Sequence, residues 1–535
     1  MALVNYLNWE VRTTGHDLNC SGFNRNRDTT NGVDYTQQDN AEITSLNWVV
    51  DSSYNTRIRS EDLTNWINSG KALASLKGNH IHIAGMAIAG GVLFDWVAST
   101  GKPGAYYLQA KGGGNPSWTT KPARMWLNKI YTPENTNLPA GSNTWAWGDW
   151  DSLGYNTIYV RFGAENDANP SEKNQDDVIA DGKTWSRGAY EIVSVGTDAS
   201  GPFLVLDRSP AAVNSQNGYG RIGGAMASPG GVGSVTAVQG EWQGVVFIRY
   251  GIYSLNPSLS NQPTGLPSST YNCTMLGYHP DKPKGAQLDP EEMPTFICGN
   301  YSWSNNSLII IQCKFVGNMT STSSIGIQFI RCICQGLRLS ANFFACYLEN
   351  GFYNSGSFCY FKNSTGIVSA SFSIIDSCVA GGQWDSTGPY RHCVFYNSSS
   401  SGILGGANNR TQQDWEYCVA INCARYGYEP SSGWNWTFRT RVYRCFWYQC
   451  TLGGHTFPNW RTDIDIVQLP GNPFRDPANG DFRLADNEAG RMLKQAGFQI
   501  PGPQGAPPLK FDAGAVQNSF YDYIKTIVPP PIHGT

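Results

Sequence analysis

Charged residues are scarce in this chain of 535 residues. Asp, Glu, Lys and Arg make up 15% of it, against about a quarter in an average soluble protein. The net charge is −3 and Lys and Arg are not concentrated anywhere, so nothing in the sequence favours binding to nucleic acid. Long apolar runs are missing as well, and the first residues lack a basic segment followed by an apolar stretch. We therefore expect no membrane insertion and no signal peptide.

Several well-known catalytic motifs are also missing. The chain contains no Gly-rich phosphate loop, no Gly-x-Ser-x-Gly sequence and no His-Glu-x-x-His sequence. His80 and His82 alternate on one face of an expected strand, as two metal ligands can, but no third ligand follows them. We expect no cofactor and no metal site.

Glycine and aromatic residues are abundant instead. With 59 Gly, 18 Trp and 27 Tyr, the composition is typical of a turn-rich, all-β protein. From Val245 onward a short sequence motif recurs, which is called the phrase here. In it, an apolar strand with Cys or an aromatic residue is followed by an Asn or Gly turn. Its copies include "QCKFVGN", "RCICQGL", "SCVAGGQ" and "HCVFYNSSSSGI". Short strands repeating without helices predict a parallel β-helix, a solenoid in which each coil stacks on the next.

Changes in composition along the chain predict five parts. Residues 1–85 and 183–235 are expected to form an N-terminal β-rich region, interrupted by an inserted β-domain at 86–182. The parallel β-helix follows at 236–471. A segment with helical composition, 472–498, is expected to cap the solenoid, because the last coil would otherwise expose unpaired backbone groups. The Pro-rich tail, 499–535, should be extended.

Paired cysteines recur in "YCVAINCARYG" and "RCFWYQCTLGG". A missing signal peptide disfavours disulfides, and Cys-x4-Cys is not the usual spacing of structural zinc ligands. We interpret the first cysteine of each phrase as part of an interior ladder of small apolar side chains. Bends at Asn422 and Gln449 would turn Cys423 and Cys450 inward too, and Asn397 has the matching place in its copy. The predicted ladders contain the cysteines Cys313, Cys332, Cys378, Cys393, Cys418 and Cys445 and the turn amides Asn397, Asn422 and Gln449.

Acidic residues are few within the repeats. Asp414 and Glu416 alternate on one strand face and are the best pair for polysaccharide hydrolysis, with Arg391 and Arg410 nearby in sequence. The other interpretation of these residues is a solvated outer face or an ion-pair network.

An aromatic loop is the second candidate site. It contains Trp434, Trp436, Arg439 and Arg441, in the long insertion between the paired cysteines. Trp faces stack on sugar rings, and Arg binds carboxylates in bidentate fashion, so one interpretation is a glycan-binding loop. The other is packing within the loop or between subunits.

Two N-terminal stretches resemble a family of bacteriophage structural and tail-associated proteins. They are "WEVRTTGHDLNCSGFNRNRDTTNGVDYTQQDNAEIT" (Trp9–Thr44) and "WDSLGYNTIYVRF" (Trp150–Phe162). The closing segment "NPFRDPANGDFRLADNEAGRMLKQAG" is similar to that of many right-handed β-helix proteins. The resemblance implies a right-handed β-helix in a virion, often a homotrimer, assembled with other virion proteins in the host cytoplasm. It implies no catalytic residue.

Three hypotheses for function follow. The first is a virion structural protein, a tail spike or tail fibre that attaches to the host surface. The alternative is a β-helix polysaccharide hydrolase or lyase, a tailspike depolymerase that acts on host surface glycans, with Asp414 and Glu416 as its carboxylates. The third is a bacterial surface filament subunit, against which the missing signal peptide counts.

Overall fold

The computed structural model divides the chain into two compact units, each described below by itself. Unit 1 comprises residues 1–248 and 261–267, and unit 2 comprises residues 249–260 and 268–535. Among the described residues, the only α-helices are α1 (Glu61–Asn68) and α3 (Glu488–Ala496), and none is long and apolar enough to cross a membrane. The structure describes residues 8–16, 20–24, 30–90, 94–116, 120–122, 124–128, 130–181, 184–227, 244–255, 273–304, 308–323, 327–357, 359–365, 367, 369–371, 373–378, 380–381, 389–404, 413–429, 440–457, 464–479, 481–496, 499–500 and 509–510.

Unit 1 is built around a nine-stranded antiparallel sheet with the order β13-β14-β4-β3-β15-β5-β12-β8-β9. Helix α1 begins at Ser60, whose side chain accepts a hydrogen bond from the backbone N–H of Asp62. It buries Leu63 and Trp66 in the core of this sheet. The strands are β3 (Ile43–Val50), β4 (Arg57–Arg59), β5 (His80–Ala87), β8 (Arg124–Leu127), β9 (Ile130–Thr132), β12 (Val178–Asp181), β13 (Gly188–Asp198), β14 (Gly201–Leu206) and β15 (Gly218–Ile222).

A four-stranded sheet with the order β10-β11-β7-β6 lies inside the range 86–182. Strands β8, β9 and β12 come from the same range but belong to the nine-stranded sheet, so this range contributes to two sheets. The boundaries expected for an inserted domain, at 86 and 182, stay a prediction. The four strands are β6 (Phe94–Ala98), β7 (Tyr106–Ala110), β10 (Asn143–Gly148) and β11 (Thr157–Phe162).

Two aspartates hold the turn between β10 and β11. Asp149 accepts two backbone hydrogen bonds within its own turn, at 2.6 and 2.9 Å. Asp151 accepts hydrogen bonds from the backbone N–H groups of Thr100 at 2.6 Å and Gly101 at 3.0 Å, and from the hydroxyl of Ser99. Burial raises the pKa of Asp151, but these hydrogen bonds outweigh burial and lower the pKa to about 2.

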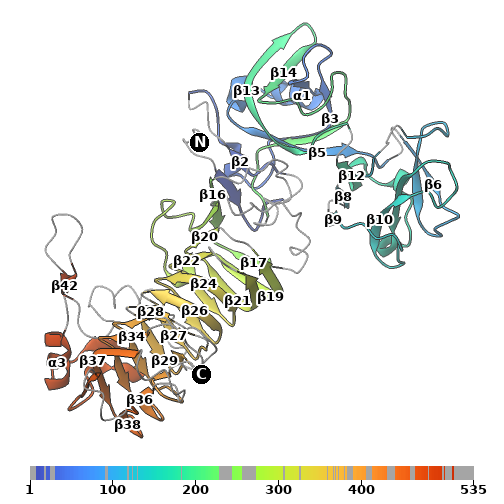
Figure 1. Ribbon diagram of the computed structural model, residues 1–535. Helices are drawn as coiled ribbons and strands as arrows, with labels where there is room; N and C mark the ends of the chain where they lie inside the picture. Colours follow the sequence, from blue (N-terminus) through green and yellow to red (C-terminus); the bar gives the residue numbers. More distant parts are fainter. Residues whose placement is uncertain are drawn as a thin grey trace, which may run out of the picture. The chain divides into compact units, whose positions relative to one another are not determined.

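Unit 2 is a parallel β-helix-like solenoid, which confirms the prediction of an all-β chain with stacked coils. Its strands pair in parallel with those of the neighbouring coils, and Figure 1 shows them stacked in succession. The later coils pair residue by residue: Val394 pairs with Val419, and Val419 pairs with Phe446. Backbone N–H groups donate from coil to coil, as in the bond from Val419 to the carbonyl of Cys393 at 2.9 Å.

Each coil contributes strands to two faces of one continuous parallel sheet, which are called below the groove sheet, after the groove on its outer face, and the second sheet. Later coils also contribute to a separate four-stranded sheet, called the third sheet. The groove sheet contains β18 (Cys273–Tyr278), β20 (Leu308–Ile311), β22 (Gln328–Ile330), β24 (Arg338–Phe344), β26 (Phe352–Ser357), β28 (Ser369–Ser371), β31 (Tyr390–Arg391), β34 (Gln413–Glu416) and the first half of β37 (Thr440–Tyr448). The second sheet contains β17 (Ile252–Leu255), β19 (Thr295–Ser304), β21 (Lys314–Ser323), β23 (Ile333–Gln335), β25 (Tyr347–Glu349), β27 (Tyr360–Lys362), β29 (Ile374–Asp376), β32 (Val394–Tyr396), β35 (Val419–Ile421), the second half of β37, and β39 (Ile464–Gln468). The third contains β30 (Ala380–Gly381), β33 (Ile403–Leu404), β36 (Tyr426–Glu429) and β38 (Gly453–His455).

The C-terminal segment packs along the second sheet. It contains β40 (Phe474–Asp476), β41 (Asp481–Leu484) and α3. The ring of Phe482 lies 6.2 Å from that of Tyr360 and 5.4 Å from that of Tyr396, centroid to centroid. These contacts cover a side of the solenoid, and the capping of its last coil by 472–498 stays a prediction. Within the expected tail, β42 (Gln499–Ile500) pairs with β43 (Leu509–Lys510), and residues 511–535 lie outside the described residues.

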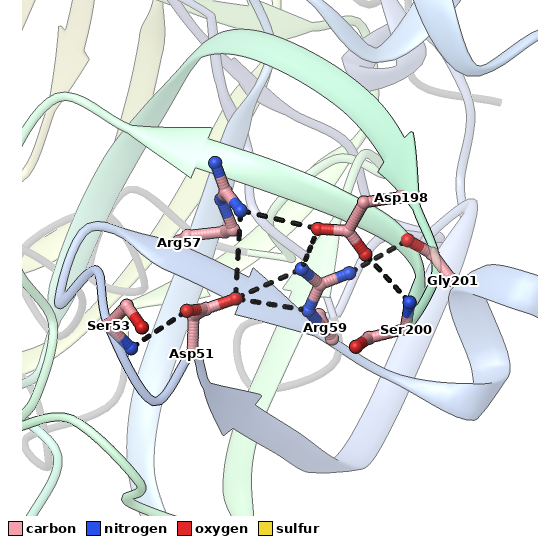
Figure 2. A network of polar contacts seen from close by, with 7 residues as sticks. All are labelled: Asp51, Ser53, Arg57, Arg59, Asp198, Ser200 and Gly201. Carbon is pink, nitrogen blue, oxygen red and sulfur yellow. Dashed lines mark hydrogen bonds and ion pairs between the residues drawn. The ribbon is translucent and has the colours of Figure 1, made fainter.

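A polar network ties two hairpins of unit 1 together, as Figure 2 shows. Arg59 Nη2 donates to Asp51 Oδ2 at 2.9 Å and to Asp198 Oδ2 at 2.6 Å, and Arg57 Nη1 donates to Asp198 at 3.3 Å. The backbone N–H of Ser53 also donates to Asp51, at 2.9 Å. The pKa of Asp51 is lowered, first by this Ser53 bond and then by Arg59, and the pKa of Asp198 is lowered first by Arg59.

We predict that Arg59→Met destabilises unit 1 in a pH-dependent manner. Both carboxyl pKa values lie below their ordinary 3.8 in the folded state. Their stabilisation is therefore fully present above about pH 4 and is lost as the pH falls through the folded values. At pH 7 the variant should melt about 2–4 °C below wild type, and at pH 2.5 this gap should shrink. Calorimetry at both pH values measures it, with Arg491→Met, which removes an exposed arginine of unit 2, as control. An equal gap at both pH values would contradict the role of the carboxylates.

Candidate functional site

The outer face of the groove sheet is formed by side chains that alternate with interior ones. In β24, Phe343 is 3% exposed and faces the interior, whereas its neighbour Phe344 is 49% exposed and faces outward. Because the strands pair in register, the outward side chains of successive coils align. Two outward columns result. Column 1 contains Gln328, Asn342, Ser355 and Ser369, and column 2 contains Ile330, Phe344, Ser357 and Ser371.

A groove of about 420 Å³ lies over these two columns and Pro389. None of the described residues that line it is charged. In the part of the chain that the structure describes, the hydroxyls of Ser357, Ser369 and Ser371 have no hydrogen-bond partner. The groove therefore offers hydroxyl and amide groups together with the exposed ring of Phe344.

Beyond the groove the same two columns continue into cross-strand ion pairs. Ser371 aligns with Arg391, which aligns with Glu416, and Arg391 Nε lies 3.3 Å from Glu416 Oε2. Asp414 aligns with Arg441 and accepts from its Nε at 2.9 Å and its Nη2 at 3.3 Å. The bonds to Asp414 raise the pKa of Arg441. Asp414 and Glu416 thus share the groove-sheet face, and each is paired with an arginine.

The aromatic loop expected to bind glycans lies almost entirely outside the described residues. This applies to Trp434, Trp436 and Arg439, and Arg410 also lies outside them. Arg441 is described, and it lies on β37 with its side chain 67% exposed, paired with Asp414.

The first cysteine of each phrase lies at a corner of the solenoid, just before a strand of the second sheet. All five of this kind are buried, namely Cys313, Cys332, Cys393, Cys418 and Cys445. Cys346, Cys359 and Ser373 occupy the same position in their coils, although they were not predicted from the sequence. The backbone N–H of Cys332 donates to Cys346 Sγ at 3.4 Å. The cysteines at this corner are free, buried thiols, and burial raises the pKa of Cys418 well above its ordinary value.

The predicted place of Cys378 in this ladder is wrong. Its coil has Ser373 at the first corner, and Cys378 lies after the next strand, at the second corner. There it aligns with Ser364, whose backbone N–H donates to its Sγ at 3.1 Å. Cys423 and Cys450 occupy the equivalent positions in later coils, so these cysteines form a second ladder. The phrase "SCVAGGQ" begins one corner later than the other copies, which its letters do not reveal.

Residues in the left-handed backbone conformation, with positive φ, form both corners. Asn397, Asn422 and Gln449 have φ values of 52°, 54° and 50°, and at the first corner Tyr417 and Arg444 have φ values of 53° and 49°. At each corner the backbone bends, so the residue after the corner faces the interior where straight alternation would point it outward. A strand of only three residues lies between the two corners. Both cysteines of a pair therefore face the interior, although they lie five residues apart.

His80 and His82 are buried on β5 in unit 1. Arg221 Nη2 contacts His82 Nδ1, and burial followed by this guanidinium lowers the pKa of His82 well below its ordinary value. Over the described ranges of the chain, no group of three or more His, Cys, Asp or Glu side chains is arranged to hold a metal ion.

The groove residues themselves were missed at the sequence level, although a signal exists. The groove is built from four three-residue strand segments, and in each segment the first and third residues face outward and the middle residue faces the interior. These segments begin at Gln328, Asn342, Ser355 and Ser369. They recur at intervals of 14, 13 and 14 residues, which is one coil each. Read alone, "SGS" and "SAS" resemble loop sequence, and only the interval identifies them as strands.

We predict that Cys418→Ser is tolerated, whereas Cys418→Leu is not. Ser373 already occupies this ladder and donates to the Ser371 carbonyl at 2.8 Å, and Cys418 Sγ lies 3.4 Å from the equivalent carbonyl of Glu416. The serine should cost about 1 kcal/mol of unfolding free energy, and the leucine about 1–3 kcal/mol through overpacking. Urea unfolding of both variants measures the difference. Equal losses would show that the ladder position does not accept a hydroxyl as Ser373 implies.

No protein-family model and no curated protein matches this chain. Among solved structures, it is similar to the catalytic domain of a GH87 alpha-1,3-glucanase variant in complex with tetrasaccharides, at 9% identity and a TM-score of 0.18, over 73% of this chain and 100% of that chain. It is also similar to a GH87 alpha-1,3-glucanase catalytic domain in complex with nigerose, at 10% identity and a TM-score of 0.18, over 74% of this chain and 86% of that chain. Scores this low carry no argument about the site.

Proposed function

We propose that unit 2 binds a glycan along the groove, as the host-attachment part of a bacteriophage tail spike or tail fibre. The observation that carries the binding function is the groove, whose described lining residues are uncharged and combine an exposed aromatic ring with hydroxyls that make no hydrogen bond to the described residues. Sugars present the same two features, hydroxyl groups and apolar ring faces, and aromatic side chains stack on those faces.

The virion part of the proposal rests on the resemblance of Trp9–Thr44 and Trp150–Phe162 to phage structural proteins. With it we propose a right-handed solenoid, a homotrimer and assembly with other virion proteins in the host cytoplasm. Immunogold labelling of purified particles with an antibody against this chain tests the location, and unlabelled particles would contradict it.

Phe344→Ala should weaken glycan binding about tenfold, because it removes the stacking surface in the groove. Biolayer interferometry on immobilised host lipopolysaccharide or capsule measures the dissociation constant. Leu452→Ala is the matched control, since Leu452 is 54% exposed in the same unit and does not line the groove. Equal binding by the Phe344 variant and wild type would contradict the groove as the binding site.

Cleavage of the glycan by hydrolase or lyase chemistry is the second candidate function, because Asp414 and Glu416 lie on the groove-sheet face. Their ion pairs with Arg441 and Arg391 disfavour it. Both carboxylates direct oxygens at an arginine, whereas a glycosidase needs both carboxyl groups directed at the scissile glycosidic bond.

We therefore predict that the wild-type protein releases no reducing ends or unsaturated products from the glycan it binds. The assay is run beside the double variant Asp414→Asn/Glu416→Gln, which keeps the size of both side chains and removes their charge. Product release by wild type that the double variant abolishes would establish the enzyme and contradict a purely binding role.

A further inference from the structure

We infer that the ligand of the groove is an electrically neutral glycan segment that runs across the strands, with one sugar ring on Phe344. This inference rests on the proposed glycan-binding function and specifies the class of glycan. It is drawn from the charges, the hydrogen-bonding groups and the register of the groove sheet.

The charges of the groove sheet favour a neutral ligand. An acidic sugar would need a guanidinium or ammonium group with free N–H donors, and no described residue that lines the groove carries one. The nearest cation along column 2 is Arg391, which Glu416 neutralises at 3.3 Å. Arg441 directs two nitrogens at Asp414. These two arginines and two carboxylates sum to zero, so a uronate or sulfate that bound to either of these arginines would have to displace a carboxylate.

The hydrogen-bonding groups of the groove match sugar hydroxyls. A serine hydroxyl both donates and accepts, and so does the amide of Gln328 or Asn342. Sugar hydroxyls also do both, whereas a carboxylate or sulfate only accepts. The side chains of Ser357, Ser369 and Ser371 make no hydrogen bond to the residues that the structure describes, so they are available to a ligand.

The register sets the direction of the ligand. Column 2 presents Phe344, Ser357 and Ser371 on consecutive coils, which are spaced by about 4.8 Å, the distance between neighbouring strands. An extended glycan running across the strands therefore meets an aromatic ring first and then a hydroxyl on each following coil. The small serine side chains leave the volume of about 420 Å³ above them.

A glycan array that pairs neutral oligosaccharides with their uronic acid and sulfated counterparts tests this inference. The full chain is applied at 50 mM and 500 mM NaCl. We expect neutral glycans to be retained at both salt concentrations, with a loss of about tenfold in Phe344→Ala. Retention of acidic glycans alone, with the same dependence on Phe344, would overturn the neutral ligand and leave the proposed function standing. No binding to any glycan would overturn both.

Two charge variants provide a second measurement on whichever glycan binds. For a neutral ligand, Ser371→Glu and Ser371→Lys should both weaken binding by a similar factor, because each fills the groove and removes a hydroxyl. For an acidic ligand the lysine variant should bind more tightly and the glutamate variant more weakly, and this outcome would overturn the inference. Ser399→Glu and Ser399→Lys are the controls, since Ser399 is exposed in the same unit outside the groove. Circular dichroism confirms that all four variants fold.

Discussion

Parallel stacking of coils in register is the constraint on which unit 2 depends. Each coil donates backbone hydrogen bonds to its neighbour, as Phe446 does to the carbonyl of Cys418 at 2.8 Å. That pairing persists only if the chain bends at the same places in every coil and fills the bends with side chains of similar size. Left-handed residues provide the bends, and Cys or Ser fills the space inside them.

The same register decides the surface. Residues that are distant in sequence become neighbours in a column, so that each outward residue has to be compatible with those on the adjacent coils. Asp414 and Arg441 are 27 residues apart and form one ion pair, while the serines that follow Phe344 leave a continuous polar groove. A single outward substitution therefore changes a site that four coils share.

Unit 1 is stabilised differently, since its antiparallel hairpins are held by specific side chains rather than by a repeating register. Asp151 accepts hydrogen bonds from a segment about fifty residues earlier, and Arg59 bridges two hairpins through Asp51 and Asp198. Carboxylates in such bridges stabilise only while they are ionised, which makes this unit sensitive to acid. In unit 2 the interior ladders consist of neutral thiols and hydroxyls, which do not impose that dependence.

The sequence by itself determined the class of the fold. Its recurring phrase predicted stacked short strands, and the buried character of cysteines such as Cys418 follows from their small apolar side chains. It also identified Asp414 and Glu416 as neighbours on one strand face, since alternation within a strand is a local property. What only the tertiary structure decided is which residues of different coils align. Loops of unequal length separate the strands, so Cys378 was placed at the wrong corner. An ion-pair network was one interpretation of Asp414, but its partner, Arg441 on the next coil, was not identified. The groove consists of two columns drawn from four coils, and such columns exist only once the backbone register between coils is set.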